Sequence, residues 1–170
     1  MATQAHWLDG PWPGRVAISA RPRGGDWLED EIAAWAREGV GAIASLLTPE
    51  EERELGLAEE AGLARGMGME FVSLPVEDRG VPVSDSEVVA VVERLVEGLK
   101  SGRNTLIHCR QGVGRAGLLA SCLLVHGGES APAAVARVSR ARGVPVPDTE
   151  AQLQWIGNFR SAMNLLARAG

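Results

Sequence analysis

One stretch of the sequence combines a nucleophile, a cation and a glycine-rich turn. It runs from His108 to Arg115 and reads His-Cys-Arg-Gln-Gly-Val-Gly-Arg. Glycines let successive backbone N–H groups turn toward one point, and the N-terminus of a following helix adds partial positive charge there. Such a turn binds a tetrahedral oxyanion. Cys109 would lie at its base, where the amides favour the thiolate, and the fork of Arg115 could bind two anion oxygens. Together these groups could support nucleophilic attack on phosphorus.

The elements on either side of this stretch distinguish a functional loop from an ordinary connection. Residues Asn104–His108 are predicted to form a short strand, and the apolar residues from Arg115 to His126 predict a helix. A histidine before the cysteine and two glycines between a strand and a helix are much more specific than a cysteine and an arginine six positions apart. The alternative is a plain strand–helix connection with a buried cysteine, and this context disfavours it.

The rest of the chain alternates strand-like and helix-like segments. Further strands are expected at residues 16–19, 42–47 and 70–74. Helices are expected from about residue 49 and at 27–38, 57–65, 84–100, 132–142 and 149–167. This alternation predicts an α/β fold with a mostly parallel central sheet flanked by helices. Nothing divides the chain, so we expect a single domain over residues 1–170, with an irregular N-terminal segment at 1–14. In such sheets ligands bind at the carboxyl ends of strands, where the glycine-rich turn lies.

Two of the helix starts carry capping signals. Thr48, Pro49 and Glu51 combine an N-cap residue, a proline in the first turn and a capping-box acid. Ser84 and Glu87 repeat the capping-box pattern ahead of an amphipathic helix. The second signal marks the end of a proline- and glycine-containing loop over residues 75–83.

Phosphoryl transfer also needs an acid, because the departing alkoxide or phenoxide is a poor leaving group unless it is protonated. The loop before residue 84 and the helix start after it offer Glu77, Asp78 and Asp85. Asp85 is explained by its place in the first turn of a helix, where the helix dipole favours a carboxylate. Glu77 and Asp78 both remain candidates on the residues alone.

Composition argues against several other classes of protein. The chain has 170 residues, 45% of them hydrophobic, and a formal net charge of -5. These values predict a globular protein and argue against nucleic acid as a partner. Two cysteines are too few for a disulfide framework. With no signal peptide or apolar membrane span in the sequence, we expect a soluble cytoplasmic protein without a membrane partner. Cys122 and His126 have the spacing of metal ligands, but no further cluster supports them, so we expect no metal and no cofactor.

The cysteine-to-arginine stretch resembles the signature of the cysteine-dependent phosphatases of the protein tyrosine phosphatase superfamily. Residues 105–109 and 112–115 are most similar to the kinase-associated type of dual-specificity phosphatase. Residues 74–82, which read Leu-Pro-Val-Glu-Asp-Arg-Gly-Val-Pro, resemble the general-acid loop of that group. Residues 149–152 resemble a later segment that carries a water-positioning glutamine. The resemblance extends from about residue 16 to residue 160, and the fold of the family agrees with the alternation of strands and helices.

The resemblance implies a hydrolase that forms a phosphocysteine intermediate on Cys109. Asp78 would be the general acid and then the general base, Gln152 would hold the attacking water, and His108 would support the loop without touching substrate. Arg115 would bind phosphate together with Arg110, Gln111, Gly112, Val113 and Gly114. The implied partners are phosphotyrosine proteins, phosphoserine or phosphothreonine proteins, or a small phosphomonoester. Phosphate, sulfate or vanadate could occupy the same loop.

One position departs from the family pattern. The family usually carries Ser or Thr after the signature arginine, and this chain has Ala116. Without that hydroxyl the thiolate is a poorer leaving group, so we expect slow breakdown of the phosphocysteine. Two alternatives therefore stay open. One is a catalytically weak phosphate-recognition module, and the other is a different thiolate enzyme with an oxyanion loop, such as a sulfurtransferase or an arsenate reductase.

Overall fold

A five-stranded sheet forms the centre of the molecule in the computed structural model, which describes residues 2–170. The strands lie in the order β1-β2-β5-β3-β4. Their bounds are β1 His6–Leu8, β2 Val16–Ser19, β3 Val40–Ser45, β4 Glu70–Ser73 and β5 Asn104–His108. β1 pairs with β2 in antiparallel fashion, and the other three pairings are parallel. The predicted α/β class with a mostly parallel sheet is therefore confirmed.

The N-terminal segment contains a strand that the sequence did not reveal. β1 pairs its His6 with Ile18 and its Leu8 with Val16, so the expectation that residues 1–14 are irregular is wrong for these three residues. The strand is too short for an alternating hydrophobic pattern, and among its residues only Leu8 is buried. Pairing with the edge of β2, and not local propensity, makes this segment a strand.

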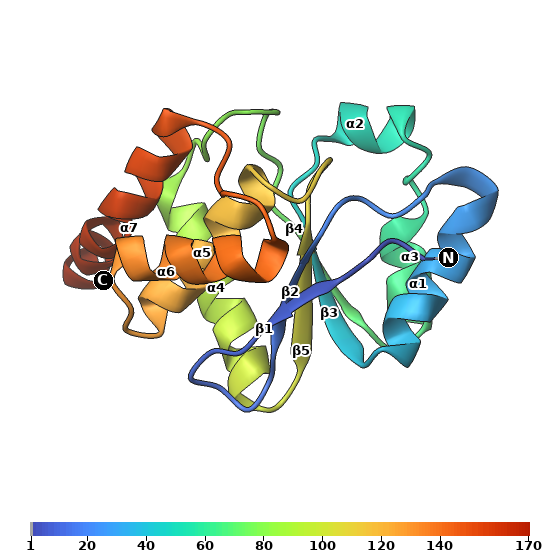
Figure 1. Ribbon diagram of the computed structural model, residues 1–170, viewed down its shortest axis with the longest axis horizontal. Helices are drawn as coiled ribbons and strands as arrows, with labels where there is room; N and C mark the ends of the chain where they lie inside the picture. Colours follow the sequence, from blue (N-terminus) through green and yellow to red (C-terminus); the bar gives the residue numbers. More distant parts are fainter. Residues whose placement is uncertain (1) are drawn as a thin grey trace.

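Helices cover both faces of the sheet (Figure 1). One face is covered by α4 (Asp85–Lys100), α5 (Arg115–His126), α6 (Ala131–Arg142) and α7 (Glu150–Ala169), and the other by α1 (Leu28–Arg37) and α3 (Glu60–Gly66). The 3-10 turn Gly25–Trp27 leads into α1, and the short helix α2 (Pro49–Glu54) lies at the carboxyl ends of the strands. Within residues 2–170, no helix is both long and apolar enough to cross a membrane.

The core is divided by the sheet into two apolar clusters. On β5, Ile107 packs into the cluster beneath α4 to α7, and its neighbour Leu106 packs into the cluster beneath α1 and α3. This alternation is expected of a strand that is covered on both faces. α5 is the most enclosed helix, because every residue from Arg115 to Val125 is buried. The strand and the helix that flank the cysteine loop are thus fixed by packing on all sides.

The capping signals behave differently at the two helix starts. Thr48 and Glu51 form the complete reciprocal capping box at α2. At α4 only half of the predicted capping box is found in the described residues: the Ser84 hydroxyl accepts from the backbone N–H of Glu87 at 3.3 Å, without the reciprocal bond from the Glu87 side chain. The Glu51 carboxylate also accepts hydrogen bonds from Arg115 and Arg110, which the capping signal did not indicate.

The depth of α4 in the core can be tested with two leucines. Leu99 of α4 is fully buried, whereas Leu165 of α7 is 65% exposed. We expect Leu99→Ala to lower the free energy of unfolding by about 2–5 kcal/mol, because it leaves a cavity against the sheet. Leu165→Ala should change it by less than about 0.5 kcal/mol. Urea unfolding of both variants measures the difference, and equal effects would contradict the packing described here.

Candidate active site

The cysteine loop connects β5 to α5 at the carboxyl end of the sheet. Gly112 in this loop has φ +71°, and a Cβ atom there would lie 2.4 Å from the carbonyl carbon of Ser19. Glycine is therefore required both by the conformation and by the closeness of β2. The guanidinium of Arg142 on α6 donates to the carbonyls of Gly112 at 3.0 Å and Gln111 at 3.1 Å. The loop is thus held from two neighbouring elements.

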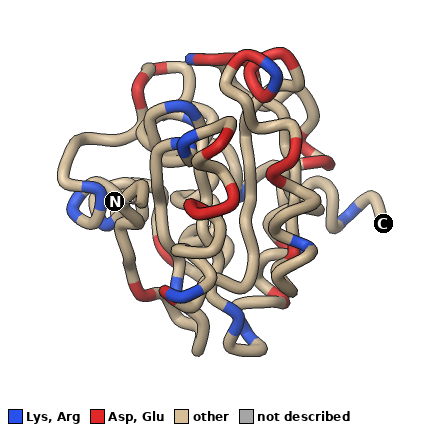
Figure 2. The backbone as a smooth tube through the Cα atoms, turned by 90° about the vertical axis from the view of Figure 1, so that its right-hand side faces the viewer, with Lys and Arg blue, Asp and Glu red and all other residues tan. Residues whose placement is uncertain are grey.

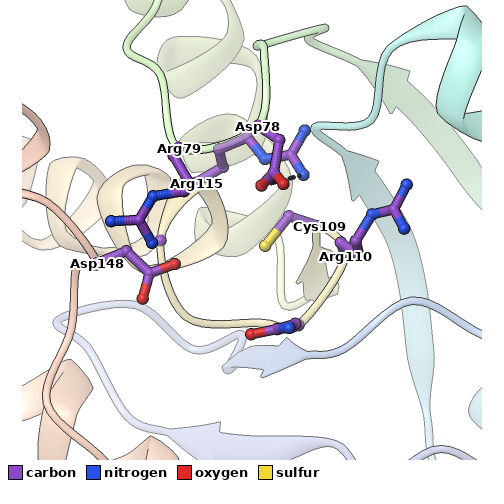
Figure 3. Close-up of a pocket in the computed structure, with 8 residues that line it drawn as sticks. Asp78, Arg79, Cys109, Arg110, Arg115 and Asp148 are labelled. Carbon is purple, nitrogen blue, oxygen red and sulfur yellow. Dashed lines mark hydrogen bonds and ion pairs between the residues drawn. The ribbon is translucent and has the colours of Figure 1, made fainter.

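A cavity of about 100 Å³ opens over this loop. Cys109 lies in it and is only 3% exposed. The cavity is lined by Asp78, Arg79, Cys109, Arg110, Gln111, Gly114, Arg115 and Asp148, and Figure 3 shows these side chains around the sulfur. Six of the eight were singled out from the sequence. In the part of the chain that the structure describes, the predicted site residues outside this lining are His108, Gly112, Val113, Ala116 and Gln152.

Arg115 is a buried cation that is bound by several groups. Its Nη1 donates to Glu51 Oε1 at 2.6 Å and to the carbonyl of Val76 at 2.7 Å. Its Nη2 donates to Glu51 Oε2 at 3.0 Å and to Asp78 Oδ1 at 3.2 Å. Burial alone would lower the pKa of Arg115, but the hydrogen bonds to Glu51, with the negative charges of Cys109, Glu51 and Asp78, raise it. The guanidinium therefore stays charged and fixed in place beside Cys109.

Glu51 is a site residue that the sequence indicated only as a helix cap. Besides the two bonds to Arg115, its Oε2 accepts from Arg110 Nε at 3.3 Å, and its Oε1 accepts from the backbone N–H of Thr48 at 3.2 Å. Burial would raise the pKa of Glu51, but the bonds to Arg115, the Thr48 amide and Arg110 outweigh it and lower the pKa to about 2. Figure 2 shows the acidic residues of α2 at the top of the molecule, the end of the sheet where the cysteine loop lies. Glu51 orients both arginines from there.

The loop between β4 and α4 carries Asp78 to the opposite side of the cavity. The Asp78 side chain is 59% exposed and points toward the cysteine loop (Figure 3). Glu77 is exposed and lies outside the lining, in the described residues. Asp85 lies in the first turn of α4, as expected. Of the three candidate acids, the structure thus brings Asp78 into the cavity, while its role in proton transfer stays a prediction.

Gln152 lies beside the cavity and is fully buried. Its Oε1 accepts from the backbone N–H groups of Asp148 at 3.0 Å and Thr149 at 3.1 Å, which caps α7. Its Nε2 donates to the carbonyl of Gly80 at 3.0 Å. Gln152 therefore connects the start of α7 to the loop between β4 and α4 that carries Asp78, called the acid loop below. Its contact with the attacking water stays a prediction.

His108 lies beneath the loop and away from the cavity. Its Nδ1 is 3.4 Å from the carbonyl of Cys109, and its Nε2 is 2.7 Å from Glu60 Oε1 on α3. His108 and Glu60 are both buried, and the imidazole lies against the indole of Trp35. No signal in the sequence pointed to Glu60. Asp148 is a further site residue that sequence reasoning missed, and it directly precedes the segment that resembles the glutamine motif.

The position after Arg115 is buried in the first turn of α5. Ala116 offers no hydroxyl to the sulfur, as the sequence implies. The second cysteine, Cys122, lies farther along the same helix, fully buried, and burial raises its pKa well above the ordinary value. Both cysteines are free thiols. Cys122 is consistent with a small core residue.

The sequence over residues 4–162 matches the family described as Swiss Army Knife protein, DSP-PTPase phosphatase domain. The match covers most of the chain. The chain therefore belongs to this family of dual-specificity protein tyrosine phosphatase domains.

Curated relatives agree with this assignment. The chain is 34% identical to cyclin-dependent kinase inhibitor 3 of Rattus norvegicus over 91 residues, which are 52% of this chain and 42% of the relative. It is also 35% identical to the putative tyrosine phosphatase 067L of Invertebrate iridescent virus 3. This match extends over 57 residues, which are 32% of this chain and 24% of the relative. The matched part spans less than half of the length of these relatives.

Solved structures share the fold over nearly the whole chain. A kinase associated phosphatase with serine in place of its catalytic-site cysteine has a TM-score of 0.89, with 22% identity and coverage of 96% of this chain and 97% of that one. Tk-PTP in its active form has a TM-score of 0.76, with 25% identity and coverage of 92% and 96%. The predicted resemblance to kinase-associated phosphatases is thus confirmed at the level of family and fold.

The lowered pKa of Glu51 predicts a pH-dependent contribution to stability. Because this pKa is about 2 in the folded chain and 4.5 ordinarily, ionised Glu51 stabilises the fold above about pH 4.5 and loses this effect as the pH falls toward 2. We expect Glu51→Gln to lower the free energy of unfolding by about 3 kcal/mol at pH 7. Urea unfolding from pH 7 to pH 3 should show this difference narrowing. Glu54→Gln on the exposed side of α2 is the control, and a difference that stays constant with pH would contradict the assignment.

Proposed function

We propose that this chain is a phosphoprotein phosphatase that hydrolyses phosphotyrosine, and also phosphoserine and phosphothreonine, through a phosphocysteine on Cys109. The observation that supports it most is the convergence of Cys109, Arg115 and Asp78 on one cavity of about 100 Å³. A nucleophile, an anion-binding cation and an acid from three different elements meet there. Membership of the dual-specificity phosphatase family makes phosphoryl transfer the reaction that fits them.

In the first step the Cys109 thiolate attacks phosphorus. The S–P bond forms while the P–O bond to the substrate breaks, and Asp78 gives its proton to the departing oxygen. Arg115 and the loop amides bind the three equatorial oxygens and stabilise the charge that develops on them. Glu51 already holds the Arg115 guanidinium in place, and the Nη2–H that Asp78 accepts can pass to a phosphate oxygen when Asp78 is protonated.

In the second step water hydrolyses the phosphocysteine. Asp78, now a carboxylate, takes a proton from the water as it attacks phosphorus, and the Cys109 thiolate leaves. Gln152 uses one N–H of its amide on Gly80, so the other N–H can hold this water. Gln152 would thus both hold the loop that carries Asp78, through the Gly80 carbonyl, and position the attacking water.

The substrate class follows from the relatives and from the site. A kinase associated phosphatase shares the fold, and TpbA of P. aeruginosa, which has a TM-score of 0.58 and 21% identity, has been seen in complex with phosphotyrosine. None of the eight residues that line the cavity in the described part of the chain is aromatic, so no wall of rings deepens the pocket. This favours a shallow site that accepts phosphoserine and phosphothreonine as well.

Ala116 favours one second candidate, a phosphate-recognition module that turns over slowly. Without a hydroxyl next to the sulfur, the intermediate would accumulate and the chain would hold a phosphoryl group or phosphate more than release it. The thiolate-enzyme alternatives gain less support. An arsenate reductase would need a resolving cysteine near the loop, and Cys122 is fully buried in α5 with its pKa raised by burial. A sulfurtransferase would have no use for Asp78.

Turnover of phenyl phosphate tests the proposed roles, because its phenoxide leaving group needs a proton. Cys109→Ser should abolish turnover. Asp78→Asn should lower kcat by about 100-fold or more, which is the usual contribution of a general acid. Glu77→Gln is the matched control, one residue away and outside the cavity lining, and should retain normal kcat. A sulfurtransferase would be unaffected by Asp78→Asn, and turnover in Cys109→Ser would refute the phosphocysteine.

Rapid mixing tests the consequence of Ala116. We expect the wild type to release one equivalent of p-nitrophenolate per chain in a burst, followed by slower turnover. Ala116→Ser should raise the steady-state rate about three- to tenfold, because one hydrogen bond to the leaving thiolate is regained. Ala120→Ser, in the same helix and equally buried, should leave the burst unchanged. Linear release from the first turnover would count against slow phosphocysteine breakdown.

A further inference from the structure

We propose that Arg79 forms a subsite for a second anionic group on the substrate, a carboxylate or a phosphate a few bonds away from the scissile phosphate. This rests on the proposed function for the scissile phosphate itself, which Arg115 and the cysteine loop would bind. Arg79 belongs to the acid loop and lines the same cavity as Cys109. Two observations carry the inference, namely the backbone at Arg79 and the pairing of the other arginines, and a nearby carboxylate limits the strength of the subsite.

The backbone at Arg79 is in a conformation that side chains other than glycine rarely adopt. Its φ is +61°, and among residues 2–170 it is the one non-glycine residue with a positive φ. The N–H of Gly80 donates to the carbonyl of Glu77 at 2.8 Å, so residues 77–80 form a tight turn with Arg79 at its third position. Glycine is favoured at that position when φ is positive. Strained residues of this kind concentrate at functional sites, where the position of the side chain repays the strain.

The other two arginines of the cavity are already paired with carboxylates. Arg115 is bound by Glu51 and Asp78, and Arg110 lies 3.3 Å from Glu51 and 3.6 Å from Glu54. Over the described part of the chain, Arg79 has no carboxylate within 4.0 Å and is exposed. Arg79 is therefore the guanidinium of this cavity whose hydrogen-bonding capacity is open to a ligand.

Asp148 opposes this attraction from the other wall of the cavity. It comes from the connection between α6 and α7, and Figure 3 shows its carboxylate and the Arg79 guanidinium pointing toward one another. Its charge weakens the pull of Arg79 on an anion and repels phosphate in general. The two residues together select substrates by charge: a second anionic group gains from Arg79, and the Asp148 carboxylate limits that gain.

The size of the cavity limits where the second group can lie. The cavity of about 100 Å³ is lined by Arg79 as well as by Cys109 and the loop that follows it. A second anion beside Arg79 would therefore be joined to the scissile oxygen by a short spacer. Phosphorylated hydroxy acids and compounds with two neighbouring phosphate groups have this arrangement.

A pair of substrates that differ by one carboxylate tests the subsite at low ionic strength. The probe is the ratio of kcat/KM for 3-carboxyphenyl phosphate to that for phenyl phosphate. Arg79→Gln should lower this ratio about three- to fivefold, the effect of losing one partly exposed ion pair. Arg79→Lys should keep most of the ratio, and Asp148→Asn should raise it. Arg140→Gln removes the same charge from an exposed position on α6 and should leave the ratio unchanged.

The outcomes separate the subsite from the proposed function. The subsite alone would be overturned if Arg79→Gln hydrolyses phenyl phosphate normally and leaves the kcat/KM ratio unchanged. It would also be overturned if Arg140→Gln changes the ratio as much as Arg79→Gln does, or if only Arg110→Gln lowers the ratio. If the wild type hydrolyses neither compound, the proposed function fails, and calorimetric titration decides on the subsite. Pyrophosphate should then bind the wild type more tightly than phosphate does, and Arg79→Gln should remove this difference in affinity. The same difference in the wild type and in Arg79→Gln would refute the subsite.

Discussion

The buried ion pair between Arg115 and Glu51 is the interaction on which the geometry of the site depends. A guanidinium that is 2% exposed would be strongly destabilising without a partner, and Glu51 gives it a bidentate one at 2.6 and 3.0 Å. Arg115 belongs to the start of α5 and Glu51 to α2, which follows β3. The same guanidinium reaches Val76 and Asp78 in the loop after β4. One buried charge thus joins the cysteine loop to the segments that follow β3 and β4.

This arrangement explains how a loop with no secondary structure of its own can present an acid. The acid loop is held near its start by the bond from Arg115 to the Val76 carbonyl and near its end by the bond from Gln152 to the Gly80 carbonyl. Asp78 lies between these two points. Because both bonds go to backbone carbonyls, they fix the path of the chain whatever side chains the loop carries. Electrostatic stabilisation is most effective when groups are placed before the reaction begins, and this loop meets that condition.

The parts of the molecule that could be predicted from the sequence are those that local patterns encode. β5, the cysteine loop and α5 follow one another within 23 residues, and their strand, turn and helix signals agree. Glu51, Glu60 and Asp148 could not be assigned to the site, because their roles come from approaches across the chain. Glu51 meets Arg115 across 64 residues, and Glu60 meets His108 across 48. A capping signal explained Glu51 fully on its own, which hid its second role. β1 was missed because three residues carry too little pattern.

Two departures from local rules lie close to the cysteine loop. Arg79 holds a backbone conformation better suited to glycine, and Glu60 beneath the loop keeps a buried Oε2 that finds no hydrogen-bond partner within residues 2–170. Other local signals agree with the structure: apolar residues alternate on β5, and the start of α2 carries its full capping box. Proteins tolerate a conflict with a local rule where it places a functional group. At Arg79 the conflict places a cation at the opening of the cavity. At Glu60 the conflict places a carboxylate against His108, the residue that precedes Cys109. Charged side chains thus lie both at the opening of the cavity and beneath the cysteine loop.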